Sequence, residues 1–379
     1  MAIGIVAEFD PFHNGHKYLV DTIKKNTGEA VVAVMSGSWM QRGGIAITDK
    51  WTRTRMAITG GVDLVFELPV VRSMATAQKF ASGAVSILAA SGIVNTLAFG
   101  SECGDKSALT KAADIIINEP PEISEKLKRL TDTGMSYAAA RAESYRGIVP
   151  KDVLDRPNDI LATEYIIASI TQNTGFDFMP VKRYGAAHNG APAQGIASAS
   201  EIRKILREGS SAAEYMPDSN FTVYDRTTLD TAVIAAWRNG DAKKLSGIAD
   251  VSEGLENRFI NAAAESVTVD ELCMRVKTKR YTLSRIRRIA YAGLLGLTKE
   301  LSDMPLSYIR VLGMTERGKD LLRQMKTAAT LPVAIKPSSL RGGCIFDFNS
   351  RAEDIFALCA KAPQLRRGGR DYTTSPVMV

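Results

Sequence analysis

Two histidines in the segment Glu8 to His16 are the residues of this chain best suited to chemistry. The chain has only three His, and His13 and His16 stand one helical turn apart with Gly15 between them. Two imidazoles at this spacing can both face a phosphate chain whose charge changes during an in-line displacement, a reaction that depends on positioning and charge stabilisation. The plain alternative is a capped, solvated helix start.

The apolar run Ile3 to Ala7 directly precedes this motif and is typical of a buried parallel strand. The motif then lies at the carboxyl end of a strand, where open α/β sheets bind their ligands. A zinc site is not indicated, so we assign no metal ligands. The four cysteines are scattered without C-x-x-C spacing: Cys103, Cys273, Cys344 and Cys359.

Further motifs follow along the whole chain. The early ones are Met35 to Gly44, Asp49 to Arg53, Gly61 to Pro69 and Phe99 to Glu102. The later ones are Arg156 to Leu161, Val181 to Arg183, Ser198 to Arg203, Lys277 to Tyr281 and Asp371 to Pro376. At the histidine motif the chain resembles the H-x-G-H nucleotidyltransferase superfamily. With all these segments it resembles the bacterial tRNA(Met) cytidine acetate ligase family over essentially its whole length.

The resemblance implies an activity, its substrates and an ATP site. Acetate would be activated by ATP as acetyl-adenylate, and the acetyl group would pass to N4 of the wobble cytidine (C34) of elongator tRNA(Met). His13 and His16 would be catalytic, and Mg²⁺ is expected beside the pyrophosphate, although no carboxylate cage for it is visible. The implied ATP-binding residues are Ala7, Glu8, Phe9, Asp10, Pro11, Phe12, His13, Asn14, Gly15, His16, Gly100, Asn158, Arg183, Ser198, Ser200 and Arg203.

Two carboxylates depart from the family pattern. Asp10 stands where Asn is common, and Asp159 stands where a second Asn often follows Asn158. Either carboxylate could weaken a phosphate contact or bind Mg²⁺, and we interpret both as tolerated variation.

Ser198 and Glu201 form a capping box at a predicted helix start, where unpaired N–H groups and the helix dipole can hold triphosphate oxygens. Ser200 and Arg203 would add to this element, and a simple N-cap is the alternative. Gly100 lets a nucleotide approach a strand end closely, or it is a turn glycine.

Asn158 follows Pro157 at a helix start and reads the adenine or ribose, or it is a cap. Lys182 and Arg183 are adjacent after a strand, so we expect one of them to miss the site, and the resemblance selects Arg183.

We expect the segment after the second predicted strand to be an acetate-binding or anticodon-binding loop. A small carboxylate needs a cation or a cluster of N–H donors and a tight apolar wall, and Trp39, Met40 and Trp51 are candidates for this wall. The alternative is a surface loop held by ion pairs. The residues assigned to this loop are Trp39, Gln41, Arg42, Asp49 and Lys50.

The basic residues concentrate in the C-terminal part. Residues 1–220 hold 23 Lys and Arg against 24 Asp and Glu, a net charge of −1, while residues 221–379 hold 25 against 17, a net of +8. This asymmetry indicates a nucleic-acid partner, with a solvated basic surface as the alternative. The resemblance implies that this partner is tRNA and not DNA. The assigned tRNA-binding cations are Lys277, Lys279, Arg280, Arg285, Arg287 and Arg288, with Tyr281 stacking on a base.

The pattern of apolar runs predicts an α/β fold with a doubly wound parallel sheet. Strands are expected at 3–7, 30–35, 64–68, 96–99 and 179–183, with a helical insertion over 106–172 and a loop at 185–195. A mostly helical, basic C-terminal domain is expected to have helices over 228–296 and 308–325, a short strand at 333–335 and a last helix at 352–361. The chain length favours two domains, 1–215 for ATP and 216–379 for tRNA.

No apolar run reaches the length of a membrane span, and the first residues form a core strand and not a signal peptide, so we expect a cytoplasmic protein without a membrane partner. Two other functions stay open. An adenylyltransferase acting on a small phosphorylated metabolite would use the same histidine motif but would not need the basic domain. A non-catalytic RNA-binding protein would keep the basic domain without turnover.

Overall fold

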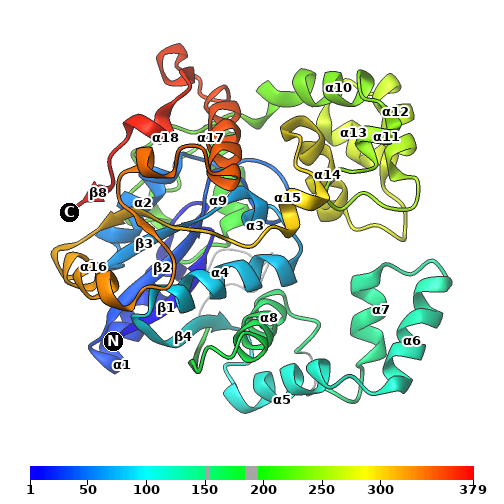
Figure 1. The fold of residues 1–379 in the computed structure, drawn as a ribbon. Helices are drawn as coiled ribbons and strands as arrows, with labels where there is room; N and C mark the ends of the chain where they lie inside the picture. The colour runs from blue at the N-terminus through cyan, green and yellow to red at the C-terminus, as the bar shows by residue number, and fades with distance from the viewer. Residues whose placement is uncertain (151–152, 184–194) are drawn as a thin grey trace.

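The molecule is built around one mixed β-sheet. In this computed structural model, which describes residues 1–150, 153–183 and 195–379, the strand order is β5-β4-β1-β2-β3-β6-β7, with β8 paired to β6 (Figure 1). The strands are β1 Ala2–Ala7, β2 Ala30–Ser36, β3 Leu64–Leu68, β4 Val94–Ser101, β5 Asp177–Lys182, β6 Ile309–Met314, β7 Val333–Ala334 and β8 Val377–Met378. The predicted loop at 185–195 falls, except for Gly195, outside the described residues.

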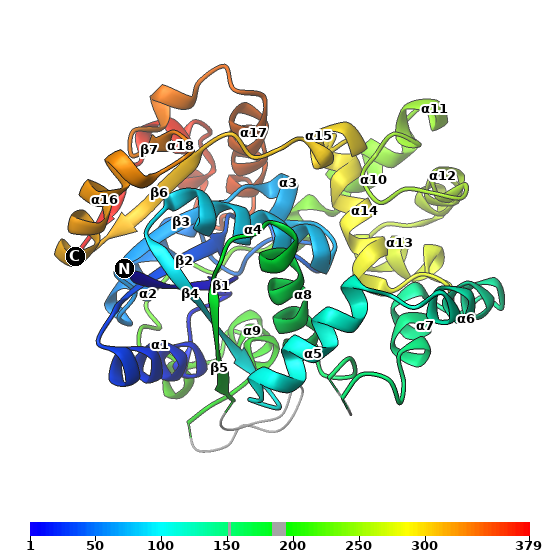
Figure 2. The ribbon, with the colours of Figure 1, turned by 60° about the horizontal axis from the view of Figure 1, so that its bottom comes forward.

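Helices cover both faces of the sheet, as Figure 2 shows. Val31 and Ala33 of β2 point to one face and Val32 and Val34 to the other, which is the alternation of a strand buried on both sides. The first face packs on α1 Asn14–Thr27, α2 Lys50–Thr59 and α9 Ala199–Arg207. The second packs on α4 Ala77–Ser91, α5 Lys106–Ile117, α8 Pro157–Thr171 and α16 Glu316–Ala328. The predicted doubly wound α/β class is therefore confirmed.

The parallel strands reverse their order next to β1. From β1 the chain continues through β2 to β3 on one side, whereas β4 and then β5 pair on the other side. The loops after β1 and β4 consequently leave the sheet in different directions at its carboxyl edge. This edge is the topological switch point where such sheets bind ligands.

Two groups of helices extend from the sheet. The predicted insertion is helical, with α5, α6 Pro121–Asp132, α7 Tyr137–Ser144 and α8. Residues 226–303 form what we call the helical subdomain, in which Trp237 stacks on Phe259 with ring centroids 4.4 Å apart. Its elements are η2 Arg226–Leu229, α10 Asp230–Arg238, α11 Ala242–Leu245, α12 Leu255–Glu265, α13 Val269–Val276, α14 Leu283–Leu295 and α15 Lys299–Asp303.

After residue 303 the chain returns to the sheet, which corrects one expectation. Residues 309–314, predicted as helix, form β6, which pairs antiparallel with β3, and α16 begins only at Glu316. A short, buried and mostly apolar segment is compatible with a strand or a helix, and here pairing with β3 makes it a strand. The sheet therefore takes strands from both sides of the expected boundary at 215, whereas the helical subdomain packs around a buried cluster of its own that includes Trp237 and Phe259. The division into two domains stays a prediction.

The remaining elements close the fold around this core. They are α3 Val70–Ser73, α17 Cys344–Ala357, α18 Arg370–Thr373, η1 Ala213–Tyr215, η3 Pro337–Leu340 and η4 Pro363–Arg366. The last long helix thus starts before the predicted position 352, whereas the short strand at 333 is present. Within the described parts of the chain, no helix has the length and apolar character needed to cross a membrane.

Candidate active site

His13 and His16 form a reciprocal cap at the start of α1. His13 Nδ1 accepts a hydrogen bond from the backbone N–H of Gly15 at 3.0 Å, and His16 Nδ1 accepts one from the N–H of His13 at 3.3 Å. The two rings stack with centroids 3.8 Å apart. An Nδ1 that accepts a hydrogen bond carries no proton, so in the neutral imidazole the proton is on Nε2. Each ring therefore offers one N–H donor.

Both imidazoles stay neutral in this environment. Burial lowers the pKa of His13 to about 3, with the cations Arg183 and Arg203 acting in the same direction. The pKa of His16 lies well below its usual value, because of burial and then the neighbouring His13 and Arg183. Neutral rings with fixed N–H groups can donate hydrogen bonds to phosphate oxygens throughout the physiological pH range, but they do not supply protons.

Buried side chains hold the loop between β1 and α1 in place. Arg53 of α2 donates from Nη1 to the carbonyls of Glu8 at 2.7 Å and Ser36 at 3.0 Å, and from Nη2 to that of Gly37. Arg53 therefore ties together the carboxyl ends of β1 and β2. The sequence interpretation missed this role of Arg53, which is one of two arginines in α2 and is the buried one.

The start of α9 faces the histidine loop. Ser198 is the N-cap, with Oγ accepting from the N–H of Glu201 at 3.2 Å and lying 3.0 Å from Ser200 Oγ. Arg203 donates from Nη1 to the carbonyl of Asp10 at 2.6 Å and lies 3.4 Å from its carboxylate. The predicted phosphate element and the histidine motif, which are distant in sequence, are therefore directly linked.

The turn after β4 and the start of α8 cap each other. Asp159 accepts from the N–H groups of Glu102 at 2.9 Å and Cys103 at 3.1 Å, while Glu102 accepts from the N–H groups of Asn158 at 3.2 Å and Asp159 at 2.9 Å. Asp159 is fully buried. This carboxylate is satisfied by backbone donors and is not free for Mg²⁺.

Asp10 is engaged in a similar way. Its Oδ1 accepts from the N–H of Ile47 at 2.6 Å, and its Oδ2 faces Arg203. The interpretation of both departures as tolerated variation therefore has a physical basis, since each carboxylate has a fixed structural partner.

These elements surround a cavity of about 470 Å³ at the switch point. All residues implied as ATP-binding line it except Pro11, Phe12 and Asn14. Phe12 is buried behind the loop, and Asn14 donates to the carbonyls of Gly195 at 2.8 Å and Glu214 at 3.0 Å. These two residues therefore support the site from behind.

The sequence interpretation missed an apolar wall of the same cavity. It is formed by Phe80 of α4, Phe99 of β4, and Leu161 and Tyr165 of α8. The rings of Phe99 and Tyr165 lie 6.2 Å apart, and burial raises the pKa of Tyr165 above its usual range. A usable signal was the position of Phe99 directly before Gly100. Lys182 also lines the cavity beside Arg183, contrary to expectation, because β5 ends at Lys182 and its alternation does not extend to the next residue.

One part of the loop between β2 and α2 lines the cavity, and the other part is buried away from it. Gln41 and Arg42 line the cavity. Trp39, in contrast, is 1% exposed, donates from Nε1 to the carbonyl of Ala352 at 3.0 Å and packs on Tyr291 of the helical subdomain. The predicted role of Trp39 as a ligand wall is wrong, because its ring forms the joint between the sheet and the helical subdomain.

Lys50 and Asp49 are likewise structural. Lys50 is fully buried and pairs with Glu67 at 2.7 Å, Asp371 at 2.6 Å and Glu353 at 3.4 Å. Asp49 is the N-cap of α2, accepting from the N–H of Thr52 at 2.9 Å. Neither lines the cavity, so their assignment to an acetate or tRNA contact is wrong, and the buried pairs show why a lysine is tolerated there.

The predicted tRNA-binding cations also divide into two groups. Lys277, Lys279 and Arg280 are exposed at the end of α13 and in the following turn. Arg288, by contrast, is 7% exposed and pairs with Asp250 at 2.6 Å. Arg285 donates to the carbonyl of Asp250 at 2.9 Å and to Ser252 Oγ at 2.7 Å. Arg285 and Arg288 are therefore engaged within the protein, and their contact with RNA stays a prediction.

Tyr281 is also not available for stacking on a base. It is 9% exposed, its hydroxyl donates to Glu253 at 2.7 Å, and Arg285 covers its ring. Arg287 shares Asp270 with Arg226, lying 3.4 Å from that carboxylate, and stays partly exposed.

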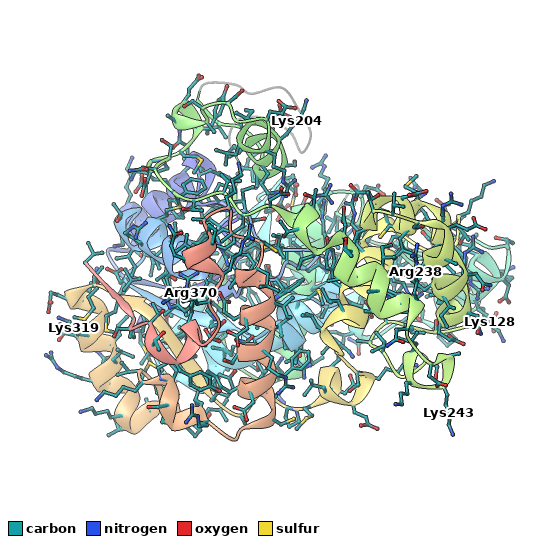
Figure 3. The ribbon with its side chains drawn as sticks, turned by 90° about the horizontal axis from the view of Figure 1, so that it is seen from above. Lys128, Lys204, Arg238, Lys243, Lys319 and Arg370 are labelled. Atoms are coloured by element: carbon teal, nitrogen blue, oxygen red, sulfur yellow. The ribbon has the colours of Figure 1, made fainter. Side chains whose placement is uncertain are left out.

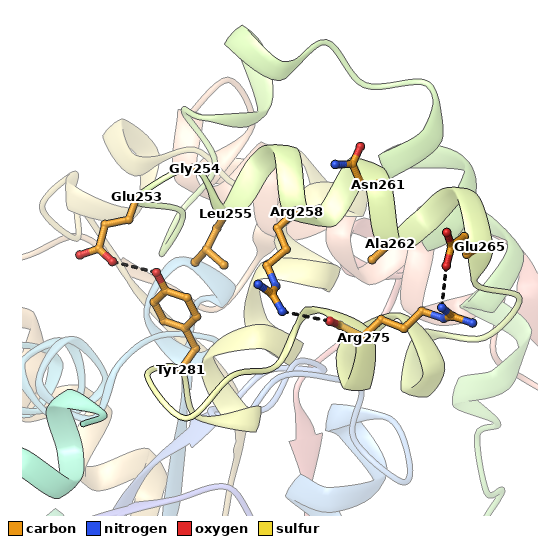
Figure 4. Close-up of a pocket in the computed structure, with 9 residues that line it drawn as sticks. All are labelled: Glu253, Gly254, Leu255, Arg258, Asn261, Ala262, Glu265, Arg275 and Tyr281. Atoms are coloured by element: carbon orange, nitrogen blue, oxygen red, sulfur yellow. Dashed lines mark hydrogen bonds and ion pairs between the residues drawn. The ribbon is translucent and has the colours of Figure 1, made fainter. Parts of the chain in front are cut away.

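A second cavity of about 600 Å³ lies in the helical subdomain, between α12 and α13 (Figure 4). Arg258 donates to the carbonyls of Val276 and Arg275, and Arg275 pairs with Glu265 at 2.7 Å. Both cations therefore already have partners. Across residues 1–150, 153–183 and 195–379, no group of three His, Cys, Asp or Glu side chains could hold a metal ion.

Comparisons with known proteins agree with this geometry. The family model described as HIGH Nucleotidyl Transferase matches residues 1–371. A tRNA(Met) cytidine acetate ligase of Thermoanaerobacter sp. (strain X514) is 38% identical, with 95% of each chain covered, and one of Acetivibrio thermocellus is 34% identical, with 100% of this chain and 99% of its own covered. The crystal structure of Thermotoga maritima TmcAL bound with alpha-thio ATP has a TM-score of 0.91 at 29% identity and full coverage of both chains. This chain belongs to the tRNA(Met) cytidine acetate ligase family of HIGH nucleotidyl transferases.

Proposed function

We propose that this protein joins acetate to a cytidine of tRNA(Met) in two steps driven by ATP. In the first step an acetate oxygen bonds to the α-phosphorus, the bond from the α-phosphorus to the bridging oxygen breaks, and pyrophosphate leaves. In the second step N4 of the cytidine bonds to the acetyl carbon, the bond from that carbon to the AMP oxygen breaks, and AMP leaves. The target is the wobble cytidine (C34) of the elongator tRNA, which becomes N4-acetylcytidine.

The observation that carries this proposal is the stacked, neutral pair His13 and His16 at the N-terminus of α1. Each ring has one N–H donor, and the backbone fixes which ring nitrogen carries it. Donors fixed before the reaction stabilise the charge that develops on the α-phosphate and the departing pyrophosphate without reorganising. Arg183, Arg203 and the start of α9 supply positive potential around the same cavity.

The cavity wall supports the handling of a reactive acyl-adenylate. Phe80, Phe99 and Leu161 exclude water from an anhydride that would otherwise hydrolyse. Arg42 lines the cavity and serves as the cation for the acetate carboxylate. The side-chain amide of Gln41 is already used, since it donates to the carbonyl of Ala75 at 2.9 Å.

Glu8 is the group that receives the proton of the cytidine amine. Among the described residues, Glu8 and Asp10 supply the carboxyl groups of the cavity, and Asp10 is already tied to Ile47 and Arg203. Glu8 lines the cavity, and its Oε1 accepts from the N–H of Gln41 at 2.7 Å, which leaves Oε2 without a hydrogen-bond donor among those residues. Burial raises the pKa of Glu8, as a base that works near neutral pH requires.

Mg²⁺ is expected with the triphosphate, but the described residues do not form a cage for it. Glu8 and Asp10 already accept backbone hydrogen bonds, so we assign no protein ligand to the ion and derive no step through it. We place the reaction in the cytoplasm, where tRNA and ATP occur, and neither a membrane nor DNA takes part in it.

The test is incubation with ATP, labelled acetate and bulk tRNA, followed by digestion to nucleosides. We expect acetate-dependent release of pyrophosphate and label in acetylated cytidine of tRNA(Met) alone. Pyrophosphate release that needs a phosphorylated metabolite and not acetate would favour the adenylyltransferase alternative. RNA binding without any pyrophosphate release would favour the non-catalytic alternative.

A further inference from the structure

The loop between β2 and α2 forms a short hairpin. Its arms, residues 38–40 and 44–46, pair antiparallel at Trp39 and Ile45. Backbone hydrogen bonds of 2.9 Å between the arms and across the tip continue this pairing, so the segment has a defined shape of its own. We call residues 38–46 the β2–α2 hairpin.

The tip and the end of this hairpin hold both carboxyl groups of the cavity wall. Gln41 in the tip donates from its backbone N–H to Glu8 Oε1 at 2.7 Å. Ile47, directly after the hairpin, donates from its N–H to Asp10 Oδ1 at 2.6 Å. Arg42 follows Gln41 and lines the same cavity. The position of the hairpin therefore decides where these charged groups lie in the proposed site.

The arms of the hairpin are buried in the core of the helical subdomain. Trp39 and Ile45 belong to the same buried cluster as Tyr291 of α14, and the rings of Trp39 and Tyr291 lie 5.7 Å apart. In Figure 3 the helical subdomain, marked by Arg238 and Lys243, stands to one side of the sheet. The hairpin thus connects that subdomain with the wall of the cavity.

Gly43 is the point where the tip of the hairpin meets α14. Its φ is +85°, which L side chains rarely adopt, and an added Cβ would lie 2.5 Å from the backbone N of Arg288 and 2.7 Å from the carbonyl carbon of Arg287. The backbone of a packed helix cannot give way as a flexible side chain can, so this contact admits only glycine. Gly43 therefore sets the distance between α14 and the tip.

We propose that Gly43 is a positioning residue for both half-reactions. By seating the tip on α14 it aims Arg42 at acetate and fixes Glu8 for the cytidine amine. The proposal rests on the proposed function, in which Arg42 binds the acetate carboxylate and Glu8 accepts the proton. A hydrogen bond from an N–H to a carboxylate weakens steeply away from its preferred distance and angle, so a small shift of the tip releases Glu8.

A purely structural role for Gly43 predicts a different result. If the close contact only stabilises the fold, an added Cβ lowers the free energy of unfolding and leaves the kinetic constants of the folded protein unchanged. If the contact positions the tip, the folded protein binds acetate more weakly and transfers acetyl more slowly. ATP binding stays intact in that case, because His13 and the start of α9 lie outside the hairpin.

The test is Gly43→Ala in the full-length protein. We expect the KM for acetate in ATP–pyrophosphate exchange to rise by roughly tenfold, and acetyl transfer at saturating acetate to slow by roughly tenfold, the size expected for one lost hydrogen bond to a charged group. The KM for ATP should stay within about twofold. The matched control is Gly134→Ala in the insertion, which has φ +87° and, among the described residues, no atom within 4 Å of an added Cβ. It has the same backbone cost without the contact and should change none of these constants.

Combining the change with Glu8→Gln makes the test specific to Glu8. Gly43→Ala should slow transfer at saturating acetate when Glu8 is present but slow it no further in Glu8→Gln, because effects that act through one group are not additive. Losses that multiply in the double variant overturn the proposal. If Gly43→Ala does not fold, Gln41→Ala repeats the test, since it removes the side-chain bond from the tip to the carbonyl of Ala75 at 2.9 Å and should slow transfer several-fold.

Acetate-dependent exchange in the unaltered protein separates this proposal from the proposed function. Absence of exchange there overturns the proposed function itself. Normal exchange there, with an unchanged KM for acetate and an unchanged transfer rate in the folded variants of Gly43 and Gln41, overturns the positioning role alone. An equal rise in the KM values for acetate and ATP also overturns it, because the defect then extends to the whole cavity.

Discussion

Sequence patterns predicted the residues around the cavity at the switch point better than they predicted which cations of the helical subdomain are free. At the cavity, most residues chosen from short motifs line one space of about 470 Å³. In the helical subdomain, Arg285 and Arg288 were chosen from a run of cations. Arg285 instead donates hydrogen bonds to Asp250 and Ser252, and Arg288 forms an ion pair with Asp250. A motif encodes local hydrogen bonds, whereas a count of charges says nothing about which of them are paired within the protein.

The largest effect is expected from His16→Ala. It should slow the overall reaction by about a hundredfold or more while leaving ATP affinity within several-fold, because a donor aimed at the transition state affects the chemical step more than ground-state binding. Single-turnover rates and ATP titration measure the two quantities. A variant that lost ATP binding but turned over normally at saturation would contradict this role.

Replacing Glu8 by Gln should reduce acetyl transfer by on the order of a hundredfold and change the pH profile. The pKa of Glu8 is raised above 4.5, so its carboxylate forms only above that raised pKa, and transfer should fall as the pH drops through it. The variant should lose this acid limb. His13 has a pKa of about 3 and His16 one well below 6.5, so neither should add a limb near 6.5.

The pH profile of adenylate formation, measured as acetate-dependent exchange, is the control for Glu8→Gln. Exchange should stay within several-fold of normal at every pH. An acid limb that persists in the variant would assign the titration to another group and remove Glu8 from the transfer step.

Replacing the exposed cations should weaken tRNA binding, whereas replacing an internally paired cation should lower stability. Replacing Lys277, Lys279 and Arg280 together by Ala should weaken tRNA binding by tens of fold and flatten its salt dependence, with each phosphate contact contributing about 0.7 to 0.9 to the slope. Adenylate formation without tRNA should persist. The comparison variant Arg288→Ala should instead lower the free energy of unfolding, since it leaves Asp250 without its partner.

Salt titrations of tRNA binding and urea unfolding measure these outcomes. A flattened salt slope in Arg288→Ala with normal stability would show that its charge reaches RNA after all. Equal loss of both half-reactions in the triple variant would show that the two regions are not separable.

The smallest effect concerns the acid that is used. One extra methylene in a tight pocket costs roughly 1 to 3 kcal/mol, so propionate should be used about 10-fold to 200-fold less efficiently than acetate. Phe80→Leu should narrow this ratio, because Phe80 lines the cavity. Trp39→Phe should leave it unchanged, because Trp39 lies at the joint with the helical subdomain. Pyrophosphate release with each acid measures the ratio, and a change confined to Trp39→Phe would move the acyl pocket to that joint.

The residues that line the cavity were more predictable than the order of the strands in the sheet. The histidine motif, Ser198 and Asn158 were identifiable because each combines a strand or helix boundary with a polar side chain, and boundaries have local signals. Phe80 and Tyr165 were missed because apolar residues on α4 and α8 resemble any other core position. The partners of Asp10 and Asp159 could not be identified from sequence, since Ile47 and Cys103 are distant along the chain.

The sequence by itself determined the alternation of strands and helices in the first half, the histidine motif after β1, the cap at α9 and the basic character of the later residues. These features depend on hydrophobic period and hydrogen bonds within a few residues. Only the tertiary structure decided that β6 joins β3, that Lys50 is enclosed by Glu67 and Asp371, and which arginines remain unpaired. The physical reason is that a charge or an apolar run has many possible partners along the chain, and folding selects one by bringing distant segments into contact.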